Sequence, residues 1–190
     1  MTETFNLLGI AGSLRGDSYN RRLLERAQRV VPEGVVLRLF DLREVPFYDG
    51  DVEAAGDPEG VRALKVAIRD ADALLIATPE YNGTIPGVLQ NAIDWASRPR
   101  GTAPLSEKPV AIAGASPGRG GTARAQAILR QVLANAGAEV IQTRPLLVSA
   151  AADALDGDGL ALTDDLTALL NEIVERVGQA TEQRREQRAA

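Results

Sequence analysis

The stretch that decides the fold reads Leu8-Gly9-Ile10-Ala11-Gly12-Ser13-Leu14-Arg15-Gly16-Asp17-Ser18-Tyr19-Asn20. It begins as an apolar strand, continues as a loop of small and polar residues, and enters a helix for which Ser18 is a candidate N-cap. Such a loop points backbone N–H groups and hydroxyls at whatever lies above the end of the strand. The helix N-terminus favours an anion there, and the permanently charged, planar guanidinium of Arg15 suits phosphate. We therefore expect this loop to hold a phosphate group.

The composition of the chain is that of one soluble globular domain. Its 190 residues are 45% apolar and 25% charged, which is ordinary for such a domain. The net charge of −5 argues against a nucleic-acid-binding surface, which would be basic. No apolar run reaches the roughly 18 residues of a membrane span, and the first residues do not read as a signal peptide. We expect no membrane contact and a cytoplasmic location.

The chain contains no cysteine and no histidine. The missing cysteines exclude disulfides, a thiolate nucleophile and iron–sulfur clusters. The missing histidines exclude a Ser-His-Asp triad and argue against an ordinary zinc site. We expect no metal centre, and an enzyme of this composition would take its difficult chemistry from a cofactor.

Short apolar segments alternate with amphipathic segments along the chain. The predicted strands cover residues 5–11, 35–40, 73–77, 110–115 and part of 139–148. The predicted helices cover about 18–31, 57–71, 86–97 and 122–136, with a last helix from 163 to about 178. Nearly continuous apolar strands separated by such helices predict an α/β fold: a doubly wound, five-stranded parallel sheet of order 2-1-3-4-5 with helices on both faces. We expect one domain over residues 1–178, loops over 42–52 and 149–161, and a polar, frayed tail over 179–190.

Polar, glycine-rich loops follow the first, third and fourth predicted strands. In a doubly wound sheet these loops meet at the carboxyl edge, beside the point where the strand order reverses, and ligands bind there. The first loop lacks the Gly-Lys-Ser/Thr of a Walker A motif, and its glycines at positions 9, 12 and 16 do not form G-x-G-x-x-G. It fits a terminal monophosphate, and an ordinary strand-to-helix turn is the alternative.

The second loop, Thr78-Pro79-Glu80-Tyr81-Asn82-Gly83-Thr84, combines rigid backbone with a tyrosine and an asparagine. Such a loop suits a flat heteroaromatic ring, which needs backbone donors at its polar edge and an apolar surface beside it. A surface tyrosine followed by a simple Asn-Gly turn is the alternative. The third loop, Ser116-Pro117-Gly118-Arg119-Gly120-Gly121, is either the other edge of the same site or a flexible turn.

Five motifs together resemble the NADPH-dependent FMN reductases, a flavodoxin-like family related to bacterial quinone, chromate and azo reductases. The motifs are Gly12-Ser13-Leu14-Arg15, Ser18-Tyr19-Asn20, Pro79-Glu80-Tyr81-Asn82-Gly83, Pro86-Gly87 and Asn91-Ala92-Ile93-Asp94-Trp95. The resemblance spans most of the chain. It implies FMN as cofactor, NADPH or NADH as hydride donor, and a small-molecule electron acceptor such as a quinone, a flavin, an azo compound or a metal oxyanion. It also implies a homodimer or homotetramer.

Carried over position by position, the resemblance also implies the site. Four residues would hold the phosphate and ribityl end of FMN: Ser13, Arg15, Ser18 and Asn20. Five would line the isoalloxazine ring: Pro79, Glu80, Tyr81, Asn82 and Gly83. Four would bound the other edge of the ring: Ser116, Gly118, Gly120 and Gly121. No side chain is proposed as an acid or base, because flavin N5 carries the chemistry, and Glu80 would act through its backbone.

Two other functions fit the same fold. A flavodoxin-type electron carrier would exchange electrons with a protein partner, and a flavin-binding sensor would show no NAD(P)H turnover. A carrier is expected to have a strongly acidic docking face, and −5 over 190 residues is mild.

Trp95 lies at the margin of the apolar arc of its predicted helix. It is either a partly buried core residue or a subunit contact, since tryptophan is favoured in both places.

Overall fold

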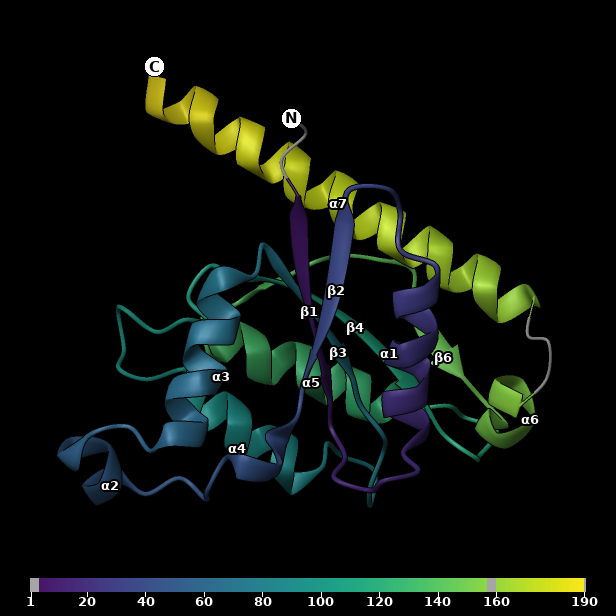
Figure 1. The fold of residues 1–190 in the computed structure, drawn as a ribbon, viewed down its shortest axis with the longest axis horizontal. Helices are drawn as coiled ribbons and strands as arrows, with labels where there is room; N and C mark the ends of the chain where they lie inside the picture. Colours follow the sequence, from purple (N-terminus) through teal and green to yellow (C-terminus); the bar gives the residue numbers. More distant parts are fainter. Residues whose placement is uncertain (1–3, 157–159, 190) are drawn as a thin grey trace.

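Six strands form one sheet in the computed structural model, which describes residues 4–156 and 160–189 (Figure 1). The strands are β1 (Phe5–Ala11), β2 (Val35–Phe40), β3 (Ala73–Ala77), β4 (Pro109–Ala115), β5 (Glu139–Val140) and β6 (Leu146–Val148). Their order is β2-β1-β3-β4-β5, β6 also pairs with β4, and every pairing is parallel. The predicted α/β fold and the strand order 2-1-3-4-5 are confirmed.

The register of the central strands brings their carboxyl ends level. Ala77, the last residue of β3, pairs with Ala11 of β1 and with Ala113 of β4. The loops after these three strands therefore start side by side at one edge, although about 100 residues separate the first from the last.

Helices cover both faces of the sheet and create two cores. The longer helices are α1 (Tyr19–Arg29), α3 (Glu59–Asp70), α4 (Gly87–Ala96), α5 (Ala123–Asn135) and α7 (Leu160–Ala189), and the short ones are η1 (Leu42–Glu44), α2 (Gly50–Ala55) and α6 (Ala151–Asp156). Leucines of α1, α6 and α7 pack against one face of the sheet. Apolar residues of α3, α4 and α5 pack against the other face. The helix that follows each loop therefore decides to which face of the sheet the loop leads.

The predicted fifth strand is wrong as a single strand. Residues 141–145 interrupt it, which leaves the two short strands β5 and β6. Pro145 stands in this interruption and lacks the N–H group that a strand ladder needs.

The two segments expected as loops contain short helices. Asp41 and Asp49 cap η1 and α2, because each carboxylate accepts a hydrogen bond from the backbone two residues on. Helix α6 lies in the second segment, of which residues 157–159 are outside the described part.

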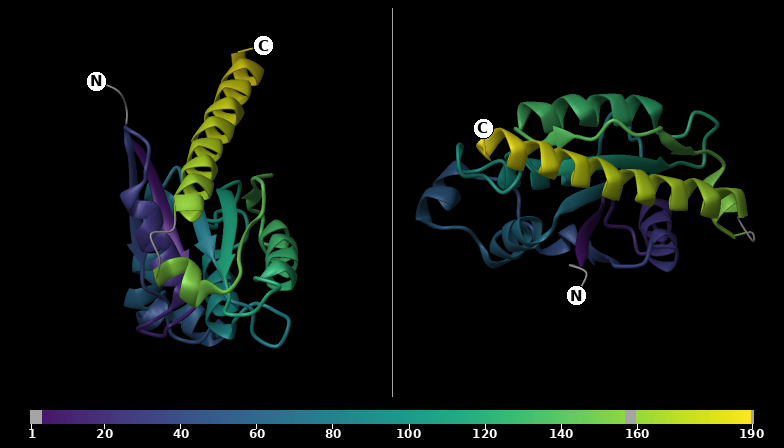
Figure 2. Two further views of the ribbon diagram at one scale, coloured as in Figure 1. Left: turned by 90° about the vertical axis from the view of Figure 1, so that its right-hand side faces the viewer. Right: turned by 90° about the horizontal axis from the view of Figure 1, so that it is seen from above.

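The last helix is longer than expected in both directions. It begins at Leu160 rather than Thr163, and residues 179–189 continue it where a frayed tail was expected. Its carboxyl-terminal part projects from the body of the protein (Figure 2). Among the described residues, no helix combines the length and the apolar character needed to cross a membrane.

Trp95 is a core residue, and its side chain is fully buried. Its Nε1 donates a hydrogen bond to the Pro46 carbonyl oxygen at 2.9 Å. Tyr48 packs edge-on against the indole with 5.0 Å between ring centroids, and Lys65 Nζ lies 5.8 Å from the indole centroid. The alternative, in which Trp95 contacts another subunit, is wrong because this chain already covers the ring.

Candidate active site

A cavity of about 200 Å³ lies at the carboxyl edge of the sheet, where the three predicted loops meet. Its lining comes from the β1–α1 loop and the start of α1, from the loop after β3, and from the end of β4 with the following loop. The lining residues are Ser13, Arg15, Ser18, Tyr19, Asn20, Pro79, Glu80, Tyr81, Ala115, Ser116 and Pro117. The other predicted site residues, Asn82, Gly83, Gly118, Gly120 and Gly121, belong to the same loops but do not line the cavity.

Three larger hollows lie elsewhere on the described part of the protein. One, of about 390 Å³, is bounded by β6 and α7, a second, of about 460 Å³, by α4 and α5, and a third, of about 270 Å³, by β5 and α7. None of them is lined by a residue of the three loops. The smaller cavity is the better candidate, because it lies at the edge where doubly wound sheets bind ligands.

Unused hydrogen-bond donors line the part of the cavity that the β1–α1 loop and the start of α1 form. Ser18 caps α1, since its Oγ accepts a hydrogen bond from Arg21 N at 3.3 Å. Ser13 Oγ accepts one from Arg15 N at 3.3 Å. In the described part of the chain neither hydroxyl donates to another group, so both hydrogens are free to point into the cavity. The N–H groups of the first helical turn also lack partners inside the helix.

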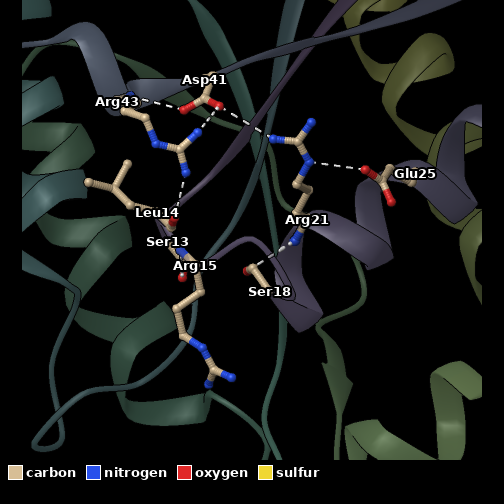
Figure 3. Close-up of polar contacts among 8 residues, drawn as sticks. All are labelled: Ser13, Leu14, Arg15, Ser18, Arg21, Glu25, Asp41 and Arg43. Carbon is tan, nitrogen blue, oxygen red and sulfur yellow. Dashed lines mark hydrogen bonds and ion pairs between the residues drawn. The ribbon is translucent and has the colours of Figure 1, made fainter.

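Arg15 supplies an unpaired positive charge beside these donors. Its guanidinium forms no hydrogen bond or ion pair with any residue that the structure describes. Figure 3 shows it pointing away from Arg21 and Arg43, which both bind Asp41. Asp17 is directed to solvent, as its side chain is 78% exposed and lies 3.8 Å from Arg22. The loop therefore presents a cation and not an acid to the cavity.

Asn20 joins the first loop region to the third. The residue is buried, and its amide donates to the Ala115 carbonyl at 2.9 Å and accepts from Ala115 N at 2.8 Å. These two bonds fix the first turn of α1 against the end of β4.

Asn82 and Gly83 form a tight turn that displays Tyr81. Tyr81 and Thr84 exchange two backbone hydrogen bonds of 3.0 Å each. The φ angles of Asn82 and Gly83 are 52° and 78°, the left-handed pair that a type I′ turn requires. Asn-Gly is the preferred sequence for this turn, so these residues shape the loop while Tyr81, 46% exposed, lies at the cavity.

The Glu80 carboxylate has a function that the sequence did not predict. It accepts hydrogen bonds from Arg124 N at 3.1 Å and Ala125 N at 3.3 Å, and it pairs with the Arg124 guanidinium at 2.6 Å. Burial alone would raise the pKa of Glu80, but the bonds from Arg124 and Ala125 outweigh it and lower this pKa. Thr122, the local N-cap of α5, makes no capping bond with its side chain, so Glu80 caps the helix instead.

The third loop is closed by Ser116 and shaped by Gly121. Ser116 Oγ accepts a hydrogen bond from Gly118 N at 3.1 Å and donates to no residue in the described ranges. Gly121 has a φ of +56°, and a Cβ there would lie 3.1 Å from Leu147 Cβ. Gly121 thus sets the course of this loop, while Ser116 provides its polar group at the cavity.

The polar groups around the cavity suit a flavin nucleotide. Serine hydroxyls, first-turn N–H groups and a free arginine in one part of the lining suit a phosphate. Pro79–Tyr81 and Ala115–Pro117 form the rest of the lining, where a flat ring needs polar partners. A volume of about 200 Å³ is below the roughly 300–1,000 Å³ of enclosing ligand pockets, so the cavity would enclose only part of such a ligand.

A doubly wound parallel sheet of this strand order, with polar loops after β1, β3 and β4 around one cavity at its carboxyl edge, defines a flavodoxin-like protein. Residues 5–153 match the model of the family described as NADPH-dependent FMN reductase, and the chain belongs to this family. It is therefore an oxidoreductase with FMN as its cofactor, and the predicted family, enzyme class and cofactor are confirmed.

Individual relatives agree with this assignment. The chain is 46% identical over 172 residues to an NAD(P)H-dependent FMN reductase of Pseudomonas aeruginosa, covering 90% of this chain and 92% of the relative. It is 34% identical over 176 residues to a quinone reductase of Pseudomonas putida, covering 93% and 94%. Among solved structures, the flavoenzyme NAD(P)H:(acceptor) oxidoreductase FerB of Paracoccus denitrificans superposes with a TM-score of 0.78 at 32% identity, covering 90% of this chain and 98% of FerB.

Proposed function

We propose that this enzyme takes hydride from NADPH or NADH and passes two electrons to a quinone. The observation that carries the proposal is the meeting of three distant loops around one cavity, with Arg15 unpaired at its phosphate end. The similarity to a quinone reductase supports the choice of acceptor.

Each predicted site residue receives one of two roles in this proposal. Residues at the cavity bind the cofactor directly: Ser13, Arg15 and Ser18 at the phosphate, and Pro79, Tyr81 and Ser116 along the ring. The remaining residues place these groups: Asn20 and Glu80 through side-chain bonds between loops, and Asn82, Gly83, Gly118, Gly120 and Gly121 through the loop backbone.

Hydride acceptance and electron transfer are chemistry that FMN supplies when it is bound. The residues of the chain bind the cofactor and orient it. Arg15 and the first turn of α1 neutralise the phosphate, which fixes one end of the nucleotide. Backbone dipoles held rigidly by the Tyr81–Thr84 turn and by the Glu80 bonds face the ring end, where preorganised dipoles favour negative charge. None of these roles needs histidine or cysteine.

One anaerobic assay tests the proposal. The purified protein is loaded with FMN, and one equivalent of NADPH or NADH per flavin is added in the absence of oxygen. We expect the yellow colour to bleach, and a quinone added afterwards to restore it with reduction of one equivalent of quinone per flavin. Protein that binds FMN but is bleached by neither nicotinamide would be a carrier or a sensor. Failure to bind FMN at all would overturn the assignment of the cavity.

Two features of the cellular protein stay predictions. The first is assembly into a homodimer or homotetramer, which light scattering on the purified protein measures. The second is the cytoplasmic location, which fractionation of the source cells measures.

A further inference from the structure

Asp41, immediately after β2, binds two arginines from different elements (Figure 3). Its carboxylate accepts hydrogen bonds from Arg43 N at 2.9 Å and from Arg43 Nη1 at 3.2 Å. It also accepts one from Arg21 Nη1 of helix α1 at 3.4 Å. Neither Asp41 nor Arg43 lines the cavity at the carboxyl edge of the sheet.

The other half of the Arg43 guanidinium reaches the phosphate loop. Arg43 Nη2 donates a hydrogen bond of 2.7 Å to the carbonyl oxygen of Leu14. The Leu14 carbonyl and the Arg15 N–H belong to one planar peptide unit. The N–H end of the same unit is held by Ser13 Oγ at 3.3 Å. The peptide that connects Leu14 to Arg15 is therefore fixed at both ends.

We propose that Arg43 is a positioning residue of the FMN site. Asp41 holds its guanidinium, the guanidinium holds the Leu14–Arg15 peptide, and this peptide sets the direction in which Ser13 and Arg15 present their donors. Without Arg43 the loop samples further conformations, and FMN binding then has to order it. The proposal rests on the proposed function, because it assumes that this loop binds the FMN phosphate.

Arg21 provides a matched control. Its side chain is 46% exposed and that of Arg43 is 53% exposed. Both guanidinium groups carry one positive charge and form an ion pair with Asp41. Arg21 Nε donates to Glu25 Oε1 at 3.0 Å, and no hydrogen bond from the Arg21 guanidinium to the loop backbone is seen among the described residues. A general electrostatic effect on FMN would therefore follow from removing either arginine, whereas a positioning effect follows only from removing Arg43.

The experiment compares Arg43→Ala, Arg43→Lys and Arg21→Ala with the unchanged protein. FMN dissociation constants are measured by quenching of flavin fluorescence on the apoprotein, and kcat is measured at saturating FMN. We expect Arg43→Ala to raise the Kd about fivefold, the loss of one ordinary hydrogen bond, with kcat unchanged. Arg43→Lys recovers part of the affinity, since an ammonium keeps the charge but lacks the fork that bridges two acceptors. Arg21→Ala leaves the Kd unchanged.

Equal increases in Kd for Arg43→Ala and Arg21→Ala would overturn the proposal in favour of a general field effect. An unchanged Kd for Arg43→Ala would overturn it outright. Should Arg43→Ala fail to fold, Arg43→Lys decides alone, because full affinity in this variant would contradict the need for a bridging fork. Unchanged protein that binds no FMN would instead overturn the proposed function.

Discussion

Arg15 differs from neighbouring arginines because its guanidinium binds nothing within the described ranges, whereas Arg21 and Arg43 bind Asp41. Arg15→Ala therefore removes no internal contact. We expect it to raise the Kd for FMN about tenfold or more, as for loss of hydrogen bonds to a charged group, while the thermal midpoint of the apoprotein stays the same. Fluorescence titration and thermal unfolding measure the two quantities.

Arg100→Ala is the control for Arg15→Ala, because Arg100 is exposed and lines a different hollow. It should leave the Kd for FMN unchanged. If both variants weakened FMN binding to a similar degree, or if Arg15→Ala did not weaken it, Arg15 would not belong to the phosphate site.

Glu80 makes the stability of the protein depend on pH. Its pKa is lowered in the folded state, so its stabilising contribution is complete above the ordinary carboxyl pKa and is lost as the pH falls through the lowered value. Glu80→Gln should lower the thermal midpoint at neutral pH by about 2–4 °C, the effect of losing a helix cap of about 1 kcal/mol. The difference from the unchanged protein should shrink as the pH falls below the ordinary carboxyl pKa and through the lowered pKa of Glu80.

Arg124→Ala separates the cap from the ion pair at Glu80. The Arg124 side chain is 78% exposed, so removing it should cost less than Glu80→Gln, because the backbone bonds to the carboxylate remain. A Glu80→Gln effect that is constant from neutral to acidic pH would contradict the assigned role.

Strand β4 depends on a residue without a side chain. A Cβ at Gly114 would overlap Thr122 Oγ1 and would lie 2.6 Å from the Thr78 carbonyl oxygen. Thr78 begins the loop after β3, and Thr122 is the N-cap of α5, so Gly114 allows two site loops to approach each other. Gly114→Ala should destabilise the protein by about 1–3 kcal/mol in denaturant unfolding and should also weaken FMN binding.

Gly87→Ala is the matched change for Gly114→Ala, since a Cβ at this first residue of α4 meets nothing within 4 Å. It should be neutral or stabilise slightly, because alanine favours the helix. Equal free energies of unfolding for the two variants would mean that β4 shifts to accommodate the added Cβ without loss of stability.

Nearly continuous apolar runs made three strands predictable with their correct bounds: β1, β2 and β3. The fifth strand failed because Pro145 interrupts a segment of mixed polarity. The short helices α2 and α6 span six residues each, too few to show helical periodicity.

The place of the candidate active site was predictable, but the side-chain bonds that hold its loops were not. Parallel topology alone brings the three loops to one edge, which is why Arg15 and Tyr81 line one cavity. Glu80 finds its partner 44 residues away, and Arg43 reaches Leu14 across 29 residues. No local pattern encodes such bonds, because they depend on side-chain positions that only the folded protein defines.

The projecting end of α7 is expected to be dispensable. The buried stripe of this helix ends at Val177, and none of the later side chains in the described part is buried. A chain of residues 1–178 should therefore bind FMN with unchanged Kd and unfold within a few degrees of the full chain, a small effect typical of surface changes. Fluorescence titration and thermal unfolding test this boundary.

A shorter chain that ends at Asn171 is the control, because this longer truncation also removes the buried Ile173 and Val177. It should be destabilised by several kcal/mol, as expected for loss of two core side chains. Loss of FMN binding in the 1–178 chain would show that the projecting end supports the site.

The two cores of the protein lie on opposite faces of the sheet, and helices from both begin at the edge where the cofactor is proposed to bind. Helix α1 begins at the proposed phosphate end and packs in one core, whereas α4 and α5 begin beside the loops proposed for the ring and pack in the other. A bound flavin would thus contact the helical layers on both faces of the sheet at the same time. Amide hydrogens in α1 and α5 should then gain protection from exchange in step as the cofactor is added, so that the layers open together rather than one by one.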